Sequence, residues 1–510
     1  MFSVFGQHGA QDNAARGTGE LWGPIRNDCA WLGRQSNLLP MQVRLREISF
    51  RMNECRTRLP FRFGVHTMTQ APMMTARAEI DTDAGPGTGF SAELLVPKWF
   101  EKNPASDLRA DAEGLVQSAR KAAEVARART ASTVFELWWR TYSECLSGVS
   151  VDAPGGLRAG FGVALVERAI LDAACRAAEM SFFEALKSDL FALRPAALYP
   201  ELGDWSPAQS LPASPAARIA VRHTIGLVDA LRASEVRDRV DDGLPEALDE
   251  DIRRYGLRYF KLKLSGDLQA DLERTLEFAA VLRETETQAA QFTVDGNEQF
   301  EDPAALLAFF ETLDREPGGR QLLEKLLYIE QPLHRARSLK HGVAAGLAAL
   351  SEIAPVIIDE SDHGIEAFPR ALDLGYGGVS VKNCKGVLRA LMQRGLCERR
   401  GGFQSGEDLT NLGVLALQQD LATMAALDLG HVERNGHHYF AGLGHLSRIE
   451  ASAALEAHPD LWESNAGTVS LAISDGELQL DSIQTPGFGY AGLIDWEART
   501  PLEDWHFSER

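Results

Sequence analysis

Five short apolar segments, each ending on a charged residue, decide the fold of this chain. They read YFKLK at 259–263, QFTVD at 291–295, LLYIE at 326–330, PVIID at 355–359 and GGVSVK at 377–382. Short runs of β-branched and aromatic residues bounded by turn residues are typical of buried strands. Helix-like segments lie between them at 271–283, 303–313 and 365–374. The stretch 259–385 therefore predicts strands that alternate with helices.

The spacing of the charged ends indicates a (β/α)₈ barrel. From Lys263 it is 32 residues to Asp295, then 35 to Glu330, 29 to Asp359 and 23 to Lys382. A barrel of about 250 residues has roughly 30 residues for each strand and its helix. Because barrel enzymes keep their active sites at the carboxyl ends of the strands, we expect these five side chains to meet at one end of a barrel.

The charges of these side chains indicate a metal site with lysines beside it. Asp295, Glu330 and Asp359 would end three consecutive strands and repel one another unless a cation lies between them. Carboxylate oxygens suit a hard divalent ion, which is Mg²⁺ first and Mn²⁺ as the alternative. A lysine close to another cation has a lowered pKa and can then act as a base at neutral pH. Together these groups suit removal of a proton α to a carboxylate.

This set of motifs resembles the enolase superfamily, in its mandelate racemase/muconate lactonizing enzyme branch. That branch includes muconate cycloisomerases, dipeptide epimerases and o-succinylbenzoate synthases. It has a K-x-K strand, three carboxylate metal ligands on the next three strands and a lysine on the strand after. By this resemblance Asp295, Glu330 and Asp359 are the metal ligands. Lys263, the second lysine of K-x-K, and Lys382 are the catalytic lysines on opposite sides of the barrel.

The resemblance also implies the architecture and the reaction. It predicts an α/β fold: a modified TIM barrel at 216–464, preceded by an α+β capping domain at 41–215 that the tail at 465–510 completes. It implies an isomerase or lyase that removes the α-proton of a small carboxylate substrate through an enediolate. Whether the outcome is racemisation or epimerisation, cycloisomerisation or dehydration stays open.

Further side chains near the predicted site are candidates for supporting roles. Lys261 shares a strand face with Lys263 and should lie deeper in the barrel, lowering the pKa of its neighbour. Asn297 shares the face of Asp295. Glu360 follows Asp359 on the other face of the strand and is a reserve candidate that could reach the lysines, while Glu407 either borders the pocket or caps a helix. Lys385 is expected at the surface.

The capping domain offers two more candidates. Strands are expected at 43–50, 75–80 and 89–96, and helices at 108–128, 133–145 and 164–186. Residues 60–70 (PFRFGVHTMTQ) are predicted to be a loop over the substrate, in which Arg62 and His66 meet an anionic substrate or solvent. Residues 193–215, rich in Pro and Ala, are expected to be a linker.

The ends of the barrel are less sharply marked. The first strand is expected at 217–226, where the Arg222-His223 pair faces either the pocket or solvent. The eighth strand is expected at 426–429. The following segment, GHVERNGHHYFAGLG at 430–444, is rich in His and Gly; we interpret it as a flexible loop, with a second metal site as the alternative.

Composition excludes several classes of protein. The 510 residues carry a formal net charge of −20, which argues against nucleic acid and anionic membranes as partners. No apolar run reaches the roughly 20 residues of a membrane helix. Six cysteines without a C-x-x-C pair indicate neither a zinc site nor a disulfide framework, as expected of a cytoplasmic protein. Residues 1–40 are predicted to be a disordered extension, and we expect a homo-oligomer.

Two other functions stay open at this stage. A barrel lysine can be a nucleophile, so a Schiff-base lyase is one alternative. Trapping of substrate on Lys263 by borohydride would favour it. The other alternative is a catalytically silent barrel kept for binding, against which the complete set of carboxylates and lysines speaks.

Overall fold

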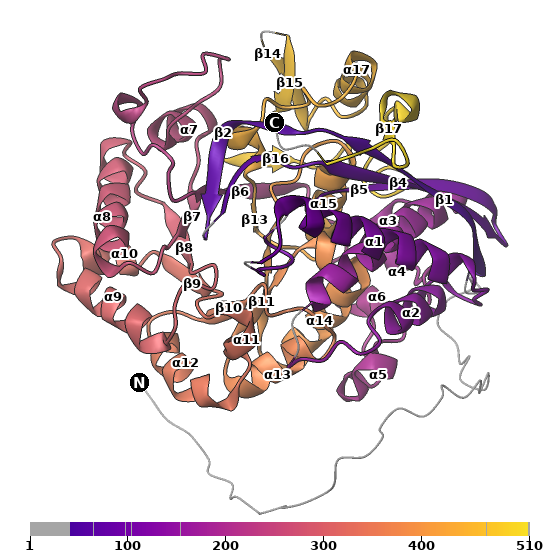
Figure 1. Ribbon diagram of the computed structural model, residues 1–510, viewed down its shortest axis with the longest axis horizontal. Helices are drawn as coiled ribbons and strands as arrows, with labels where there is room; N and C mark the ends of the chain where they lie inside the picture. Colours follow the sequence, from indigo (N-terminus) through magenta and orange to yellow (C-terminus); the bar gives the residue numbers. More distant parts are fainter. Residues whose placement is uncertain are drawn as a thin grey trace, which may run out of the picture. The chain divides into compact units, whose positions relative to one another are not determined.

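The computed structural model describes residues 41–64, 66–96, 98–103, 105–152, 155–465 and 467–507. The extension predicted at 1–40 lies outside these residues. Figure 1 shows the described chain as a ring of strands with helices around it, next to an antiparallel sheet with its own helices.

Eight parallel strands in the described part of the chain close into a barrel. They are β6 (Arg218–Ile225), β7 (Tyr259–Lys263), β8 (Gln291–Asp295), β9 (Leu326–Glu330), β10 (Val356–Ile358), β11 (Gly378–Val381), β12 (Phe403–Gly406) and β13 (His431–Glu433). Each pairs with its neighbour in chain order, and β13 pairs back with β6. Strand β16 (Glu477–Gln479) adds an antiparallel neighbour to β6. The predicted TIM barrel is confirmed.

The predicted position of the eighth strand is wrong. Residues 426–429 are the end of helix α15 (Leu415–Ala426) and the turn after it, and the strand begins five residues later than expected, at His431. The apolar side chains that suggested a strand, Leu427 and Leu429, are instead buried around the end of this helix. The predicted flexible loop at 430–444 is also wrong, because it contains β13 and the short helix α16 (Gly436–Tyr439).

Helices follow the strands and cover the outside of the barrel (Figure 1). They include α7 (Leu248–Tyr255), α8 (Leu268–Glu284), α9 (Pro303–Arg315), α10 (Gly319–Leu323), α11 (Arg335–Ser338), α12 (Ala344–Ser351), α13 (Ala367–Leu374), α14 (Val387–Arg400) and α15. Helix α17 (Arg448–Ala457) instead lies beside the hairpin of β14 (Trp462–Asn465) and β15 (Thr468–Leu471). Helix α9 illustrates why they form. Asp302 caps it by accepting from the amide of Ala304, and Pro303 occupies its first turn. Its apolar stripe, with Phe309 and Leu313, is buried.

The N-terminal region is an antiparallel sheet with helices, as the resemblance implied. Strands β1 (Val43–Asn53), β4 (Met73–Thr82) and β5 (Gly85–Leu94) pair in chain order. Helices α1 (Leu108–Arg127), α2 (Val134–Cys145), α3 (Gly156–Ala177) and α4 (Phe182–Lys187) follow. A tail strand, β17 (Thr500–Pro501), pairs with β1, so the tail returns to this sheet. The exact domain boundaries stay predictions.

Three local expectations in this region are corrected. Residues 60–70 belong to a hairpin of β2 (Arg56–Phe63) and β3 (His66–Gln70), not a loop. The helix expected at 164–186 is two helices, because Ser181 and Glu184 form a capping box that starts α4. The expected linker at 193–215 carries α5 (Pro195–Leu198) and α6 (Pro207–Ser210), and Tyr199 between them is buried.

The cap packs closely onto itself and onto the tail through α3. A Cβ at Gly89 of β5 would lie 2.1 Å from the backbone nitrogen of Ala173, so only glycine fits there. Asp172 of α3 accepts hydrogen bonds from the amides of Phe90 (2.8 Å) and Phe488 (2.6 Å). One buried carboxylate thus joins β5, α3 and the tail.

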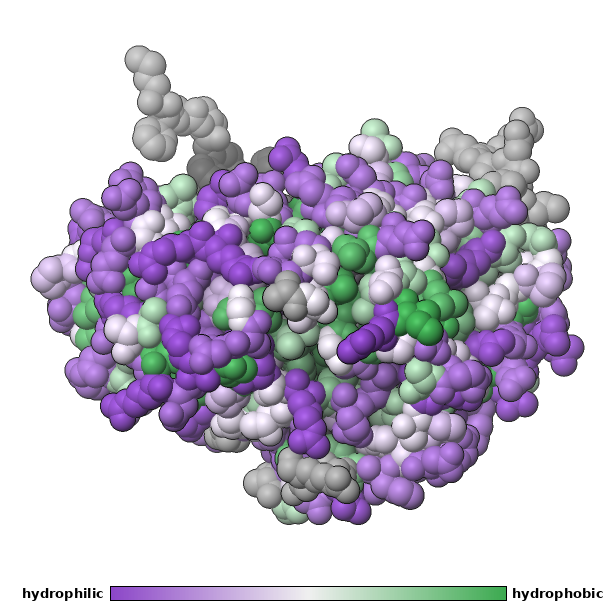
Figure 2. All heavy atoms as spheres, turned by 90° about the horizontal axis from the view of Figure 1, so that it is seen from above, coloured by the Kyte–Doolittle hydropathy of each residue, from purple (hydrophilic) through white to green (hydrophobic). Residues whose placement is uncertain are grey.

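The face of the described chain that Figure 2 draws is mostly hydrophilic. Figure 2 shows smaller hydrophobic patches between hydrophilic residues on the face that it draws. In the part of the chain that the structure describes, no helix has the length and apolar character to cross a membrane. The predicted homo-oligomer stays a prediction.

Glu167 links the cap to the barrel. It lies on α3, is 4% exposed and accepts a hydrogen bond of 2.6 Å from the amide of Leu388 at the start of α14. Burial raises the pKa of the Glu167 carboxyl to about 7, more than the hydrogen bond from Leu388 lowers it. The native state therefore holds a proton that the unfolded chain releases at lower pH.

This raised pKa predicts a pH-dependent stability. The contribution of Glu167 to the free energy of unfolding should be complete below pH 4.5. It should fall by about 3 kcal/mol as the pH rises to 7 and above. The variant Glu167→Gln, which keeps the acceptor and removes the charge, should lose less stability than wild type between pH 5 and pH 8. Urea unfolding at both pH values measures the difference. Glu113→Gln, at an exposed position on α1, is the control. If the stability of Glu167→Gln changed with pH as much as that of wild type, the expectation would be contradicted.

Candidate active site at the carboxyl end of the barrel

Lys261 lies at the centre of the site, enclosed by four carboxylates from different strands. Its Nζ atom is 2.7 Å from Glu330, 2.7 Å from Glu407, 2.9 Å from Glu433 and 3.1 Å from Asp295. The side chain is fully buried. Burial lowers the pKa of Lys261, but the four carboxylates outweigh it and hold the pKa well above the ordinary value. Lys261 is therefore a fixed positive charge.

Lys263 and Lys382 lie beside this centre on opposite sides of the barrel. Lys263 ends β7 and donates to Asp295 Oδ2 at 2.6 Å. Lys382 follows β11, with Nζ 3.2 Å from Asp359 Oδ2 and 5.6 Å from the centre of the Trp99 ring. The lowered lysine pKa that we expected is not found at Lys382: burial lowers it, but Asp359 and other carboxylates raise it well above the ordinary value.

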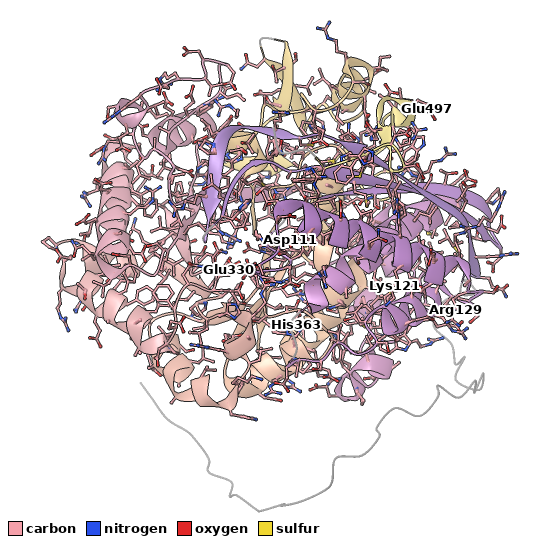
Figure 3. All side chains as sticks on the ribbon, viewed as in Figure 1. Asp111, Lys121, Arg129, Glu330, His363 and Glu497 are labelled. Carbon is pink, nitrogen blue, oxygen red and sulfur yellow. The ribbon has the colours of Figure 1, made fainter. Side chains whose placement is uncertain are left out.

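The three predicted metal ligands end neighbouring strands and are buried. Asp295 of β8 is in register with Glu330 of β9, and Asp359 follows β10 directly. All three are at most 1% exposed, and Figure 3 labels Glu330 within the barrel. Neither oxygen of Glu330 accepts a well-directed hydrogen bond, although Lys261 Nζ lies 2.7 Å from Oε2. Burial and the nearby Asp295 raise the pKa of Glu330 well above its ordinary value.

Asp359 lies among three lysines that favour its charged form. Burial raises its pKa, but Lys382, Lys385 and Lys261 outweigh burial, so that the pKa lies well below the ordinary value. Lys385, expected at the surface, is in fact buried, with Nζ 3.2 Å from Asp359 Oδ1 and 2.5 Å from the carbonyl of Ser380. The short turn after Lys382 directs it back toward β10.

Glu407 and Glu433 belong to the charged interior of the barrel. Glu407 accepts from Arg222 of β6, from Lys261 and from Ser405. Arg222 therefore faces the interior, one of the two orientations that the sequence left open. Sequence analysis missed Glu433 because the eighth strand was placed too early. The alternation in His431-Val432-Glu433 was the available signal.

A cavity of about 360 Å³, partly open to solvent, lies above these charges. Polar groups line its floor, among them Lys263, Lys382, Asp359 and Asn297. Apolar groups line the rest of its wall: Phe61, Phe63, Val96, Trp99 and Leu409. Both Phe residues come from the β2–β3 hairpin, so the cap supplies part of the wall.

Ion pairs fix the cap segment that carries Trp99. Arg335 donates to the carbonyls of Trp99 (2.8 Å) and Phe100 (3.1 Å) and is paired with Glu298. Lys102 pairs with Glu298 and lies 3.7 Å from Glu360. These contacts join residues far apart in the sequence, and no local pattern indicated them.

The remaining predicted residues divide into two groups. Asn297 lines the cavity and donates at 3.4 Å to Glu360, which is buried behind it and is not among the cavity residues. Burial raises the pKa of Glu360 to about 7. Arg62 is exposed, since strand alternation turns it away from its neighbours Phe61 and Phe63. His66 packs at the edge of the Phe63 ring, 5.7 Å between centres, and is not among the cavity residues.

A capped (β/α)₈ barrel with carboxylates and lysines at the carboxyl ends of its strands has the architecture of a barrel enzyme. The family model described as "Enolase C-terminal domain-like" matches residues 243–492. A search of curated proteins found no match. The barrel part of the chain, residues 243–492, belongs to the enolase superfamily, in the mandelate racemase/muconate lactonizing enzyme branch.

Solved structures share the fold at low identity. A muconate lactonizing enzyme from Pseudomonas fluorescens, complexed with muconolactone, is 17% identical with a TM-score of 0.55, covering 88% of this chain and 97% of its own. An enolase from Bradyrhizobium, complexed with magnesium and mandelic acid, is 15% identical with a TM-score of 0.55, covering 88% and 96%. A 2-chloromuconate cycloisomerase from Rhodococcus opacus is 16% identical with a TM-score of 0.55, covering 90% and 97%.

The enclosure of Lys261 predicts a large cost of removing its charge. Lys261→Met should destabilise the protein by about 3–5 kcal/mol, because four buried carboxylates lose their shared cation. The double variant Lys261→Met/Glu433→Gln should recover part of this loss. Urea unfolding measures both, with the exposed Lys340→Met as control. A Lys261→Met protein as stable as this control would refute the structural role.

Proposed function

We propose that this protein is an Mg²⁺-dependent enzyme that removes the α-proton of a small carboxylate substrate. The observation that carries the proposal is that Lys263 and Lys382 line one cavity from opposite sides of the barrel. Asp359, a predicted metal ligand, lines the same cavity. A substrate carbon held between the two lysines has one ammonium or amine group on each face, which suits proton removal and delivery.

The predicted ligands are suitable for Mg²⁺. Asp295, Glu330 and Asp359 offer only oxygen atoms, which hard divalent ions prefer. All are buried, and although Lys261 Nζ lies 2.7 Å from Oε2 of Glu330, Oε1 has neither a hydrogen bond nor an ion pair of its own among the described residues, which leaves it available to a metal ion. When bound there, Mg²⁺ would supply positive charge next to the substrate carboxylate. Mn²⁺, with the same ligand preference, is the alternative.

The chain's own charges prepare the site for proton transfer. Lys261 has no access to the cavity and holds the surrounding carboxylates in place. Lys263 and Lys382 reach the substrate and take or give the proton. Loss of the α-proton produces an enediolate, whose negative charge the two lysines and Lys261 stabilise electrostatically. Phe61, Phe63 and Trp99 keep water away from the reacting carbon.

The lining of the cavity also indicates how the substrate is oriented. The carboxylate of the substrate fits the charged floor, where Lys263 and Lys382 lie, and the rest of the molecule meets Phe61, Phe63 and Leu409. An apolar or aromatic substituent suits this wall, because it gains from leaving water. Arg62, which points to solvent, takes no part in this arrangement.

The proposed metal site makes a direct prediction. The protein should bind about one Mg²⁺ per chain, and Glu330→Gln should bind it at least tenfold more weakly. Mutating a residue that only supports a metal ligand already lowers metal affinity by roughly 10–100-fold. Isothermal calorimetry with MgCl₂ measures both affinities. Glu366→Gln, exposed just before α13, is the control and should bind as wild type. Wild-type affinity in Glu330→Gln would remove Glu330 from the ligand set.

The two lysines predict which reaction follows proton removal. In a racemisation or epimerisation each lysine serves one face, so Lys263→Ala and Lys382→Ala should each lose several orders of magnitude in turnover. Either variant could still exchange the α-proton of one enantiomer. In a cycloisomerisation or syn dehydration one lysine transfers the proton and the other acts as a cation, so Lys382→Arg should keep measurable turnover while Lys263→Arg does not.

Proton exchange in D₂O, followed by NMR over a small library of carboxylic acids, provides the measurement. Lys121→Arg, exposed on α1, is the control and should exchange as wild type (Figure 3). Full exchange of both enantiomers in Lys263→Ala would show that Lys263 is not a base. Covalent trapping of a substrate on Lys263 by borohydride would instead favour the Schiff-base alternative.

A further inference from the structure

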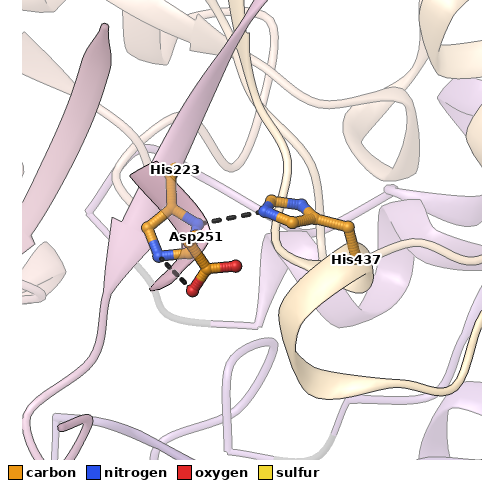
Figure 4. Close-up of side chains that lie close together, drawn as sticks. All are labelled: His223, Asp251 and His437. Carbon is orange, nitrogen blue, oxygen red and sulfur yellow. Dashed lines mark hydrogen bonds and ion pairs between the residues drawn. The ribbon is translucent and has the colours of Figure 1, made fainter. Parts of the chain in front are cut away.

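A second cluster of metal-ligating side chains lies at the seam where the first barrel strand meets the eighth. His223 comes from β6, Asp251 from α7 and His437 from α16, which follows β13 (Figure 4). One ligand atom from each lies within 4.8 Å of the other two, and no other group of three in the described residues meets this criterion. His223 follows Arg222 on β6, and because Arg222 faces the interior, strand alternation turns His223 toward the surrounding helices.

The cluster is buried and its polar atoms are poorly satisfied. Asp251 is fully buried, His223 is 2% exposed and His437 is 7% exposed. Both oxygens of Asp251 and Nδ1 of His437 lack a well-directed hydrogen bond. Buried polar atoms without partners are rare and costly, so such a group indicates an additional partner.

One distance suits a shared cation: His223 Nδ1 lies 3.0 Å from His437 Nε2, and two nitrogens on one tetrahedral Zn²⁺ are about 3.3 Å apart when each bond is about 2.0–2.1 Å. Asp251 Oδ2 lies 3.8 Å from Nε2, the other ring nitrogen of His223, and 2.8 Å from Nδ1 of His438, which is 2% exposed. His438 is thus a partner of the carboxylate, and the position of the ion is set by the three residues whose ligand atoms lie within 4.8 Å of one another. A bound ion would replace the direct contact between His223 and His437.

We propose that His223, Asp251 and His437 bind a divalent transition ion of the Zn²⁺ class. Imidazole nitrogens with one carboxylate favour such an ion over Mg²⁺, which requires oxygen donors. The burial of all three ligands leaves no access for a substrate, so the site is structural. It is separate from the carboxylates around Lys261, and it does not depend on the proposed reaction.

Such an ion would fasten the closure of the barrel. Its ligands join β6 and α7 to α16, and α16 begins just after Asn435, which lines the substrate cavity and donates to Glu433 at 2.9 Å. Tyr439 of α16 also stacks on Phe61 of the cap hairpin, with ring centres 4.3 Å apart. The ion would therefore hold in place the eighth strand's loop and, through it, one side of the cavity.

The test uses the full-length chain, produced without a histidine tag and stripped of metal with a chelator. It is then equilibrated with Zn²⁺ in excess Mg²⁺, so that the carboxylate site does not take up zinc, and bound zinc is measured by mass spectrometry. We expect one Zn²⁺ per chain in wild type and at least a tenfold weaker affinity in His437→Ala and in Asp251→Asn. His341→Ala, exposed, is the control and should bind as wild type.

Cobalt gives a second readout that needs only the wild-type protein. Co²⁺ in place of Zn²⁺ should produce the intense visible absorption of a tetrahedral site, and added Zn²⁺ should abolish it. Wild type that retains no zinc in excess Mg²⁺ and shows no such absorption would overturn the proposal. Zinc retained equally by folded His437→Ala and Asp251→Asn would also overturn it, since the ion would then lie elsewhere.

Discussion

The charge of Lys261 is the constraint on which the interior of the barrel depends. Four carboxylates from β8, β9, β12 and β13 converge on one buried ammonium group, and each would be unstable there without it. Because the carboxylates come from both halves of the barrel, the lysine fixes the mutual positions of strands that are far apart in the sequence. Most barrels fill their interior with layers of apolar side chains. An interior filled by carboxylates instead needs a positive charge at its centre, which Lys261 supplies.

This centre also determines where chemistry can occur. Lys261 is enclosed and cannot reach the cavity, whereas Lys263, two residues later on the same strand, can. Strand geometry thus separates a structural lysine from a reactive one within a single K-x-K motif. The cap then closes the other side: Trp99 lies over Lys382, held there by Arg335 through backbone carbonyls.

The sequence predicted the barrel and the buried charges because these follow from local patterns. The apolar runs that end on Asp295, Glu330 and Asp359 have the length and composition of buried strands and the spacing of one barrel unit, and the structure has a strand at each of them. The failures came where local pattern and tertiary contact disagree. Leu427 and Leu429 look like a strand but pack at a helix end, and the contacts of residues such as Glu298 are invisible until the chain is folded.

Strand β6 shows how one short segment serves two networks. Arg222 points inward, where Glu407 links it to Lys261, and His223 points outward to Asp251 and His437. The same strand pairs with β13, so both networks lie across the point at which the barrel closes. Closing a barrel brings together the ends of a long chain segment, which costs entropy and gains no help from local contacts. Polar networks on both faces of the closing strand oppose that cost, because each is satisfied only when β6 and β13 are in register.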